Sequence, residues 1–295
     1  MTSFDDHGAA PARTTPAEYR IAFQGRPGAY SHMACRQHYP ELEPLPCHSF
    51  EDAFAAVREG AARLAMIPVD NSVAGRVADV HHLLPQGGLH IVGEHFLRVN
   101  HQLLAVPGAS LETIRIVESH VHAIGQCRAF LRRHGYEAKV VADTAGAAAE
   151  VAAAGDPSRA AIASRLAAEI YGLVVLASDI EDAEHNTTRF LVLAREPRWP
   201  SLRDGPVITT FTFRVRNRPA ALYKALGGFA TNGVNMVKLE SYIDGAFAQA
   251  RFYADIMGHP EEDRVRYAFE ELRFFSHNVE ILGVYPADPF RERVG

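Results

Sequence analysis

Between Tyr19 and Leu193 the chain alternates short apolar runs with longer, Ala-rich stretches whose apolar residues recur at helical spacing. Runs of strand length occur at Tyr19–Phe23 and Leu64–Val69, and Pro68 is expected to stop the second strand. The alternation of strands with helices predicts an α/β architecture with largely parallel sheets. Such sheets bind ligands beyond the carboxyl ends of their strands, so residues that follow strands are the first candidates for chemistry.

Capping patterns mark helix boundaries in this part of the chain. Ser49 and Asp52 form a capping-box pattern before a predicted helix, and Gly172 is placed to end another helix as its C-cap. Val121–Arg133 is predicted as a single helix. Strand–helix pairs of this kind continue to the end of the part, which supports an interpretation as successive βαβ units.

A change of composition separates this part from the rest of the chain. Arg195–Pro206 contains three prolines and Trp199, and it is interpreted as a linker. From Ile208 to Tyr285 the pattern restarts as strand, helix, strand, strand, helix, strand, which predicts a ferredoxin-like βαββαβ unit. Pro219 suits the first position of the first helix in that unit.

Composition narrows the class of protein. The chain has 295 residues, of which 47% are apolar and 22% charged, and its net charge is −5, which predicts a globular protein of two domains. No run of Lys and Arg exceeds two residues, which disfavours nucleic-acid binding. No apolar run reaches the about 18 residues of a membrane span. Residues 1–18 lack the apolar segment of a signal peptide and are interpreted as a disordered tail.

Cysteine and histidine usage predicts neither disulfides nor a metal. Cys35, Cys47 and Cys127 are odd in number and form no C-x-x-C pair. Reduced thiols of this kind are typical of a cytoplasmic protein. The histidines form no H-E-x-x-H frame, so no metal site is expected.

Hydroxyl and amide side chains gather just after predicted strands, with one cation beside them. They are Asn71, Ser72, Ser119, Gln126, Asn186, Thr187, Thr188 and the cation Arg189. Such groups can orient an oxygen-rich anion, but none is a base tuned to abstract a proton. The Gly25–Gly28 turn between a strand and a helix is either a tight βα turn or an anion-binding turn. The residues alone indicate a binder, or a lyase, of a small acid with several oxygens.

Four segments resemble the motifs of one enzyme family in order and spacing. They are Phe23–His32, Ile67–Gly75, Ser119–Cys127 and Asn186–Phe190, the last of which contains a Thr-Arg-Phe segment. Through these motifs the chain resembles the prephenate dehydratases. The resemblance implies a cytoplasmic carbon–oxygen lyase of phenylalanine biosynthesis that forms phenylpyruvate, water and carbon dioxide without a cofactor. It also implies two lobes like those of a type II periplasmic-binding-protein fold, with the substrate in the cleft between them.

The same resemblance implies roles for the candidate residues. Thr188 is expected to donate a hydrogen bond to the departing hydroxyl, and Arg189 either pairs with a substrate carboxylate or fixes its own strand. The expected catalytic set is Thr188, Arg189, Asn71, Ser119 and Gln126. The expected substrate-binding set is Ser72, Gly75, Thr187, Phe190, Gly28 and Ser31.

The region from Ile208 to Pro286 resembles the ACT regulatory domain that commonly follows this catalytic part. Its phenylalanine-binding motifs correspond here to Asn217, Pro219, Ala220, Ala221, Leu222, Glu240 and Ser241. The resemblance implies feedback inhibition by L-phenylalanine and assembly into a homodimer or homotetramer.

The chain departs from the family pattern at four places. Asp70 stands for the usual Glu of the second motif, and Val121-His122 stands for Pro-Gln in the third. In the regulatory part, Ala220 stands where Gly is typical and Tyr242-Ile243 replaces Arg-Pro. These last two departures make a lost or altered phenylalanine sensor one of the expectations.

The predicted organisation has five parts. They are a tail (1–18), a catalytic domain (19–195), a linker (196–206), a regulatory domain (207–287) and a second tail (288–295). Within the catalytic domain, lobe one comprises 19–100 and 177–195, and lobe two comprises 101–176. Two alternatives stay open, an arogenate dehydratase and a non-catalytic sensor of small acids. No nucleic acid or membrane is expected as a partner.

Overall fold

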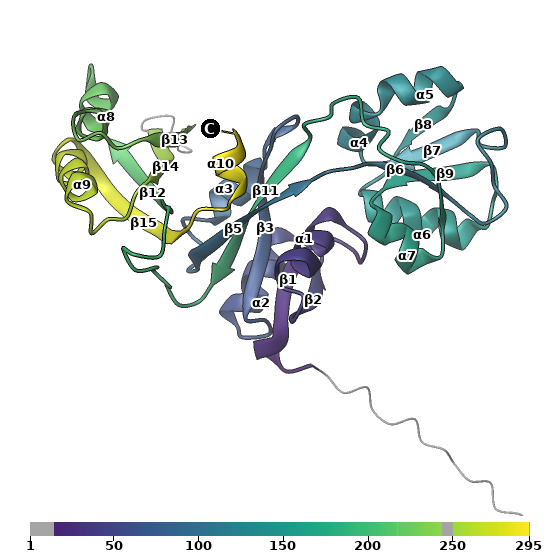
Figure 1. Ribbon diagram of the computed structural model, residues 1–295, viewed down its shortest axis with the longest axis horizontal. Coiled ribbons are helices and arrows are strands. Elements are labelled where there is room, and N and C mark those ends of the chain that lie inside the picture. The colour runs from purple at the N-terminus through teal and green to yellow at the C-terminus, as the bar shows by residue number, and fades with distance from the viewer. Residues whose placement is uncertain (1–14, 217, 244–249, 295) are drawn as a thin grey trace, which may run out of the picture.

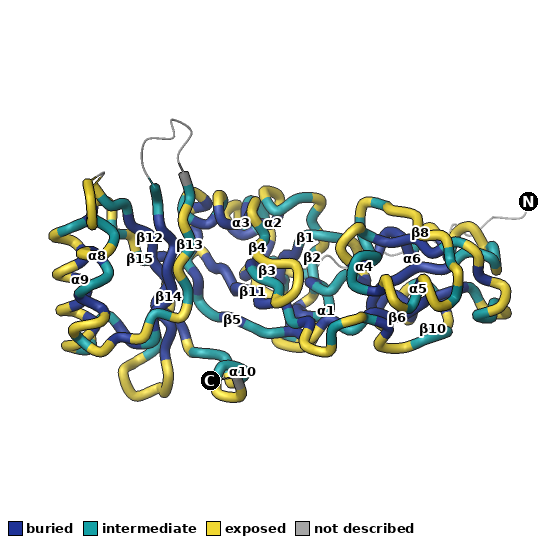
Figure 2. Tube along the Cα trace, turned by 90° about the horizontal axis from the view of Figure 1, so that it is seen from above, coloured by how far each residue is buried: buried dark blue, intermediate teal, exposed yellow. Residues whose placement is uncertain are grey.

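The protein is described by a computed structural model that covers residues 15–216, 218–243 and 250–294. Figure 1 shows three bodies in a row, with lobe one in the middle, lobe two on one side and the C-terminal domain on the other. Figure 2 shows that buried residues follow the strands of all three bodies, whereas the helices expose their outer faces. In the described ranges, no helix is long and apolar enough to cross a membrane.

Lobe one is built on a mixed sheet. Its elements are η1 (Ala17–Tyr19), β1 (Arg20–Gln24), α1 (Tyr30–His38), β2 (Glu43–Cys47), α2 (Phe50–Arg58), β3 (Leu64–Asn71), β4 (Gly75–Arg76), α3 (Ala78–Leu83), β5 (His90–Arg98) and β11 (Thr187–Ala194). Strands β2, β1 and β3 are parallel, and β11 runs antiparallel between β3 and β5. The predicted capping box is confirmed, because Ser49 and Asp52 exchange both hydrogen bonds at the start of α2.

Lobe two has a sheet of its own. Its elements are β6 (Gln102–Ala105), β7 (Ile116–Ser119), α4 (Val121–Gln126), α5 (Arg128–His134), β8 (Glu137–Val140), α6 (Thr144–Ala154), β9 (Arg159–Ala163), α7 (Arg165–Tyr171) and β10 (Val174–Ala177). The strand order is β10-β6-β9-β7-β8. The chain enters this lobe between β5 and β6 and leaves it between β10 and β11. Two sheets joined by two crossings are the architecture that a type II periplasmic-binding-protein fold predicts.

The C-terminal domain has the predicted βαββαβ order. Its elements are β12 (Val207–Val215), α8 (Ala221–Thr231), β13 (Met236–Ile243), β14 (Ala250–Met257), α9 (Asp263–Phe275), β15 (Ser276–Pro286) and α10 (Phe290–Val294). The strand order β13-β14-β12-β15 confirms the ferredoxin-like prediction. Helix α10 lies in the segment 288–295 that was expected to be a tail, and it returns to lobe one, where Arg291 binds Glu94.

The C-terminal domain and lobe one share one sheet and one core. Strand β15 pairs with β5 in parallel at Gly283 and Ile91. A Cβ atom on Gly283 would lie 2.2 Å from the carbonyl oxygen of Ile91, so only glycine permits this approach. Ile208, Tyr253 and Tyr285 join the apolar core of lobe one. The two bodies are therefore one packed unit, which the linker pattern in the sequence did not indicate.

Three local predictions were wrong, each for a tertiary reason. Strand β3 continues through Pro68 to Asn71, because Pro68 lies at a bulge in its pairing with β11. The predicted helix Val121–Arg133 breaks at Cys127, and Asp182 binds the backbone N–H of Ala129 at the start of the second half.

The third difference concerns α8, which begins at Ala221 rather than at Pro219. Ala220 is the N-cap of the helix and adopts the left-handed conformation with φ +60°. That conformation costs an L-residue other than glycine about 1–2 kcal/mol. The Gly that is typical of the family at this position would avoid that cost.

We therefore expect Ala220→Gly to raise the free energy of unfolding by up to about 1 kcal/mol, since glycine removes the strain but adds entropy to the unfolded chain. Urea unfolding of the two proteins measures the difference. Ala225→Gly, in the interior of the same helix, serves as the control and should be destabilising. Equal losses of stability in both variants would contradict the expectation.

Candidate active site

The ends of β3 and β11 bring Asn71 and Thr188 side by side. The two residues are partners in the antiparallel register, and the Nδ2 atom of Asn71 lies 2.9 Å from the Oγ1 atom of Thr188. The same Nδ2 atom donates to Oδ1 of Asn186 at 2.8 Å. Nδ2 of Asn186 in turn donates to Oε1 of Gln126 at 2.9 Å. Residues of both lobes thus meet at the crossing between the lobes.

Backbone groups determine the direction of these hydrogen bonds. Oδ1 of Asn71 accepts from the backbone N–H groups of Val73 and Ala74, at 3.0 and 2.7 Å. A backbone N–H can only donate, so the other end of the Asn71 amide must be the NH₂ group. Asn71 therefore donates to Thr188, whose own hydroxyl hydrogen is not used in that bond.

His101 and Tyr30 extend the chain of hydrogen bonds. Nε2 of His101 lies 2.7 Å from Oε1 of Gln126, and Nδ1 lies 2.7 Å from the hydroxyl of Tyr30. Because Oε1 is an acceptor, His101 carries its proton on Nε2 and accepts through Nδ1. Burial lowers the pKa of His101, although Gln126 and Glu181 oppose the shift, so a neutral ring is favoured at pH 7. We call Tyr30, Asn71, His101, Gln126, Asn186 and Thr188 the hinge cluster.

The break between α4 and α5 positions Gln126 in this cluster. The backbone carbonyl of Gln126 accepts from the N–H of Asp182, at 2.6 Å. The segment that returns to lobe one therefore holds the end of α4. An unbroken helix would have used that carbonyl internally.

The structure leaves other expected site residues outside the hinge cluster. Ser119 is fully buried and its hydroxyl donates to the carbonyl of Ile162, at 2.6 Å. Phe190 is 1% exposed and packs in the core of lobe one. Both side chains are therefore occupied by the fold, which differs from the catalytic and substrate-binding roles expected of them.

Ser72, Thr187 and Gly75 form the turn beside the cluster. The Ser72 hydroxyl donates to the carbonyl of His185 and accepts from the backbone N–H of Thr187, at 2.7 and 2.9 Å. Gly75 has φ +82° and pairs with Asn71. These residues fasten the start of β11 to the end of β3.

Gly28 and Ser31 lie where the two lobes touch. The carbonyl of Gly28 accepts from the Ser164 hydroxyl at 2.5 Å. A Cβ atom on Gly28 would lie 2.8 Å from Cα of Ala167, and φ is +91°. The Gly25–Gly28 turn is therefore a close contact between lobes, and Ser31 is buried directly after it.

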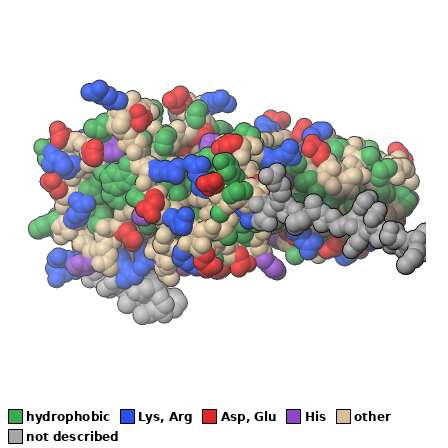
Figure 3. Space-filling view, turned by 90° about the horizontal axis from the view of Figure 1, so that it is seen from below, with side chains coloured by type: hydrophobic (Ala, Val, Ile, Leu, Met, Phe, Trp, Pro, Cys, Tyr) green, Lys and Arg blue, Asp and Glu red, His purple; other side chains and the backbone are tan. Residues whose placement is uncertain are grey.

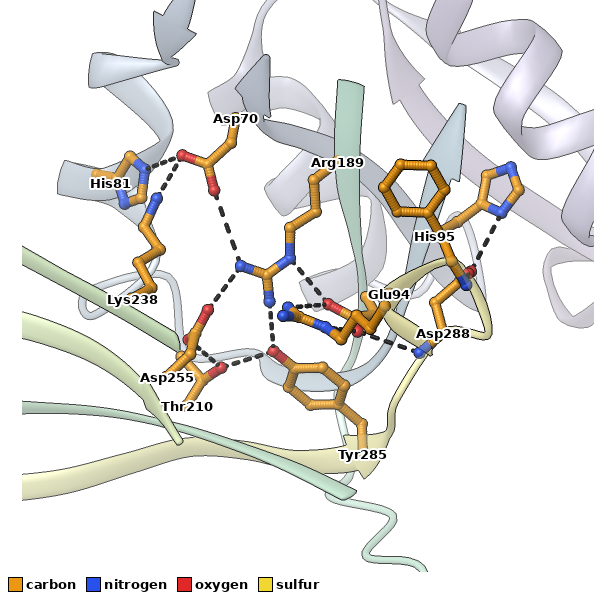
Figure 4. Close-up of polar contacts among 12 residues, drawn as sticks. Asp70, His81, Glu94, His95, Arg189, Thr210, Lys238, Asp255, Tyr285 and Asp288 are labelled. Atoms are coloured by element: carbon orange, nitrogen blue, oxygen red, sulfur yellow. Dashed lines mark hydrogen bonds and ion pairs between the residues drawn. The ribbon is translucent and has the colours of Figure 1, made fainter. Parts of the chain in front are cut away.

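Arg189 lies among acidic and hydroxyl groups (Figure 4). Its side chain is 6% exposed. Nε donates to Glu94 at 2.8 Å, Nη1 to Asp255 at 2.6 Å and Nη2 to the Tyr285 hydroxyl at 2.9 Å. Burial alone would lower the pKa of Arg189, but Asp255, Tyr285 and Glu94 outweigh it and raise the pKa. Of the two expected roles, the contacts match the structural one, because protein groups already bind the guanidinium.

Asp70, on the neighbouring strand β3, is also a charged residue that binds a charged group of the C-terminal domain. It pairs with Lys238 of β13, and lies 3.7 Å from Nη1 of Arg189 and 3.8 Å from Nε2 of buried His81 (Figure 4). Burial alone would raise the pKa of Asp70, but His81, Lys238 and Arg189 outweigh it and lower the pKa to about 2. Asp70 is therefore ionised and binds the C-terminal domain.

A pH dependence follows from Asp70. Its pKa in the folded state lies below the ordinary value near 3.9, so the stabilisation is complete above about pH 4 and is lost as the pH falls toward 2. We expect a loss on the order of 1–2 kcal/mol from this residue, after solvent screening. Urea unfolding at pH 5 and pH 2.5 should show a smaller loss in Asp70→Asn than in the native chain. The exposed Asp263→Asn serves as the control, and an equal loss in all three proteins would contradict the assignment.

The expected effector residues are only partly described. Asn217 lies outside the described residues, and Pro219 and Ala220 form the turn before α8, followed by Ala221 and Leu222 in the helix itself. Oε2 of Glu240 lies 3.3 Å from Nη1 of Arg76, which follows Gly75 of the second motif.

Tyr242, which replaces the usual Arg, packs against His81 and His82 and lies beneath Arg76. Glu240 and Tyr242 thus both connect β13 to lobe one. In this chain the position of the family Arg is used for contact between domains.

An open pocket borders the same strand ends. It has a volume of about 940 Å³ and lies between lobe one, β13 and α10. Its walls include Asn71 and Thr187, the Phe96 and Phe290 rings, which stack at 4.7 Å, and Lys238. The volume is in the range of pockets that bind small molecules.

The described residues form neither a uniformly basic surface on the face drawn in Figure 3 nor a cluster of metal ligands. On the face drawn in Figure 3, Lys and Arg side chains are interspersed with Asp and Glu instead of forming one basic surface. Across residues 15–216, 218–243 and 250–294, no group of three or more His, Cys, Asp or Glu side chains could hold a metal ion.

Sequence reasoning missed four residues that the structure uses. Tyr30 and His101 complete the hinge cluster, and nothing in their local pattern indicated that they contact each other or that His101 contacts Gln126. Glu94 and Asp255 bind Arg189, and these two had a signal, because each is an acidic residue directly after an apolar run, Ile91–Gly93 or Phe252–Ala254, in a predicted strand. A charge on a buried strand requires a partner of opposite sign.

The fold and site together define a class of protein. A two-lobed α/β domain holds two hydroxyls, three amides and one imidazole at its hinge, and so can bind a small acid and polarise one of its oxygens. The family model described as prephenate dehydratase matches residues 21–198 of this chain. The chain belongs to the prephenate dehydratase family.

Relatives cover nearly the whole chain. A Komagataeibacter europaeus protein, named bifunctional N-acyl-homoserine lactone acylase/prephenate dehydratase, is 52% identical over 92% of this chain and 98% of its own length. Arogenate dehydratase/prephenate dehydratase 1 of Arabidopsis thaliana is 40% identical over 93% of this chain and 74% of its own length. The structure of prephenate dehydratase in complex with L-Phe from Arthrobacter aurescens matches with a TM-score of 0.84 and 31% identity, covering 91% and 90% of the two chains.

Proposed function

We propose that this protein converts prephenate to phenylpyruvate, with loss of water and carbon dioxide, in L-phenylalanine biosynthesis. The observation that supports this most directly is the hydrogen bond from Asn71 to Thr188. Since Thr188 accepts in that bond, its hydrogen is available to the hydroxyl that departs from the substrate. Gln126 lies within the same hydrogen-bonded cluster, is partly exposed, and can orient the carboxylates or the keto group.

The reaction needs no tuned base. The bond from the ring to its carboxylate breaks, and the electron pair enters the ring as carbon dioxide leaves. The carbon–oxygen bond at the opposite end breaks with its pair on oxygen, which takes one proton from solvent and departs as water. Aromatisation of the ring supplies the driving force, so the protein must hold the dianion and stabilise charge on the departing oxygen. A Thr hydroxyl is a weak acid, so Thr188 polarises that oxygen or relays the proton.

The test is ultraviolet detection of phenylpyruvate from prephenate, with purified protein and no added metal. Formation of phenylpyruvate supports the proposal. If neither prephenate nor arogenate is turned over, the dehydratase proposal is overturned. Calorimetric binding of prephenate without turnover would then favour the non-catalytic sensor.

Arogenate is the alternative substrate, and the Arabidopsis relative named for both activities favours testing it. Arogenate carries an amino group where prephenate carries the keto oxygen. The ratio of kcat/KM for the two substrates decides between them. A ratio that favours arogenate would reassign the enzyme within the same family.

We also propose that L-phenylalanine inhibits the enzyme through the C-terminal domain, in a homodimer or homotetramer. The related structure in complex with L-Phe and the expected motif at Glu240 and Ser241 support this. Phenylalanine should suppress turnover in the same assay, and light scattering should give the size of two or four chains. Turnover that phenylalanine does not affect would assign the loss of regulation to Ala220 and Tyr242.

A second activity, N-acyl-homoserine lactone hydrolysis, is favoured by one observation. The relative named for both activities is 52% identical along nearly its whole length. Chromatographic detection of free homoserine lactone from an N-acyl-homoserine lactone is the test. Absence of that product, in a preparation that dehydrates prephenate, would restrict the chain to the dehydratase activity.

A further inference from the structure

Two neighbouring strand ends each carry one residue toward the hinge and one toward the C-terminal domain. In the register of β3 and β11, Asn71 pairs with Thr188, and Asp70 pairs with Arg189. Successive residues of a strand point to opposite faces. Asn71 and Thr188 bind each other in the hinge cluster, whereas Asp70 and Arg189 bind groups of the C-terminal domain.

Asp255 of β14 is the main anchor for Arg189. Its carboxylate is fully buried and accepts from Nη1 of Arg189 at 2.6 Å and from the Thr210 hydroxyl at 2.7 Å. Because Thr210 donates to Asp255, the Tyr285 hydroxyl donates to Thr210, at 2.6 Å, and accepts from Arg189. Three strands of the C-terminal domain therefore hold one guanidinium through bonds of defined direction (Figure 4).

Lys238 of β13 is the matching anchor for Asp70. Its side chain is 13% exposed, it binds Asp70 directly, and its ammonium lies 5.8 Å from the centre of the Tyr253 ring. Tyr253 belongs to the core shared with lobe one. Lys238 is thus held against a rigid surface, and its position determines that of the Asp70 carboxylate.

The open pocket shows why these ion pairs matter for the strand ends. Asp70, Asn71, Thr187 and Arg189 all line that space of about 940 Å³. Close packing therefore does not enclose the strand ends on this side. On this side the charged contacts to Lys238 and Asp255 hold the strand ends, in addition to the pairing within the sheet.

We infer that Lys238 and Asp255 are positioning residues for the dehydration, so that the C-terminal domain helps to set the geometry of Asn71 and Thr188. The inference rests on the proposed function. Misplacing a catalytic group by about 1 Å can cost on the order of 100-fold in rate, so small shifts of β3 or β11 should appear in kcat. Binding of the substrate should change less, because Gln126 ends α4 and is held there by the backbone N–H of Asp182.

The experiment compares full-length variants with matched changes. Lys238→Met removes the charge but keeps an unbranched side chain, and Lys238→Arg is the conservative rescue. Asp255→Asn tests the second anchor. Arg266→Met is the control, since it breaks ion pairs with Asp263 and Glu270 on α9, at the outer side of the same domain. Steady-state kinetics with prephenate and hydrogen exchange of residues 187–190 are measured for each.

Lys238→Met should lower kcat by about 10-fold, change KM by less than about 2-fold and speed exchange at residues 187–190. Lys238→Arg should restore most of the rate, and Arg266→Met should behave like the native chain. If Asp255→Asn does not fold, Lys238→Met decides alone. A native kcat in Lys238→Met, or an equal loss in Arg266→Met, overturns the inference.

Failure of the proposed function is distinguishable from failure of this inference. If the native chain turns over neither prephenate nor arogenate, the function proposal fails, and hydrogen exchange still reports on the strand ends. Faster exchange in Lys238→Met but not in Arg266→Met would then support the anchoring. Unchanged exchange would overturn it.

Discussion

Replacing Thr188 with Val is expected to lower kcat for prephenate by about 10²–10⁴-fold, the usual contribution of a positioned proton donor. Val keeps the β-branched shape of Thr in β11 but removes the hydroxyl. Asn71 keeps Asn186 as an acceptor, so we expect the free energy of unfolding to change by no more than about 1 kcal/mol. Stopped-flow or steady-state detection of phenylpyruvate measures the loss.

Thr188→Ser is the control for this prediction. Serine keeps a hydroxyl that can accept from Asn71 and donate to the departing oxygen, so it should retain much more activity than Val. Near-native turnover in Thr188→Val would remove Thr188 from the mechanism. A loss of rate in both variants with a native fold would mean that the methyl group, not the hydroxyl, is what the site needs.

Replacing Arg189 with Leu is expected to lower the free energy of unfolding by about 3–5 kcal/mol, because it leaves the buried Asp255 carboxylate without its cation. Asp255 would keep Thr210 as its hydrogen-bond donor, and Glu94 would keep Arg291. Arg291 keeps a cation on Glu94, whereas Thr210 supplies Asp255 with a hydrogen bond but no charge. Urea unfolding monitored by circular dichroism measures the change.

Arg98→Leu is the matched control. Arg98 stands on the neighbouring strand β5 beside Thr187, and its side chain is exposed. Its replacement should change stability by no more than about 0.5 kcal/mol. If Arg189→Leu instead kept native stability and raised KM, Arg189 would bind a substrate carboxylate, the other role that the family resemblance allowed.

Much of the fold could be predicted because local patterns repeat along the chain. The alternation of apolar runs and helices predicted the α/β part, and the restart after the linker predicted the βαββαβ unit. Ser49 and Asp52 predicted a helix start correctly, since a capping box depends only on neighbours in the chain. The bulge near Pro68 and the helix break at Cys127 could not be placed, because the β11 pairing and Asp182 come from distant segments.

The candidate site residues, like the elements of the fold, could be predicted in part from the sequence. The motif pattern predicted one site for Thr188, Arg189, Asn71, Ser119 and Gln126, and the structure brings Asn71, Gln126 and Thr188 into one hydrogen-bonded cluster. The motif pattern could not decide which face of β11 points to the hinge. A strand alternates its side chains with a period of two, so a shift of one residue exchanges Thr188 with Arg189.

Only the tertiary structure decided that Arg189 belongs to the boundary with the C-terminal domain and that Phe190 belongs to the core. The partners of Arg189 lie 66 to 96 residues away along the chain. Their pairing depends on how three bodies pack, and a buried charge in a sequence shows only that some partner must exist. The sequence by itself determined the elements and the chemical types at the site, whereas packing between distant strands decided which side chains meet.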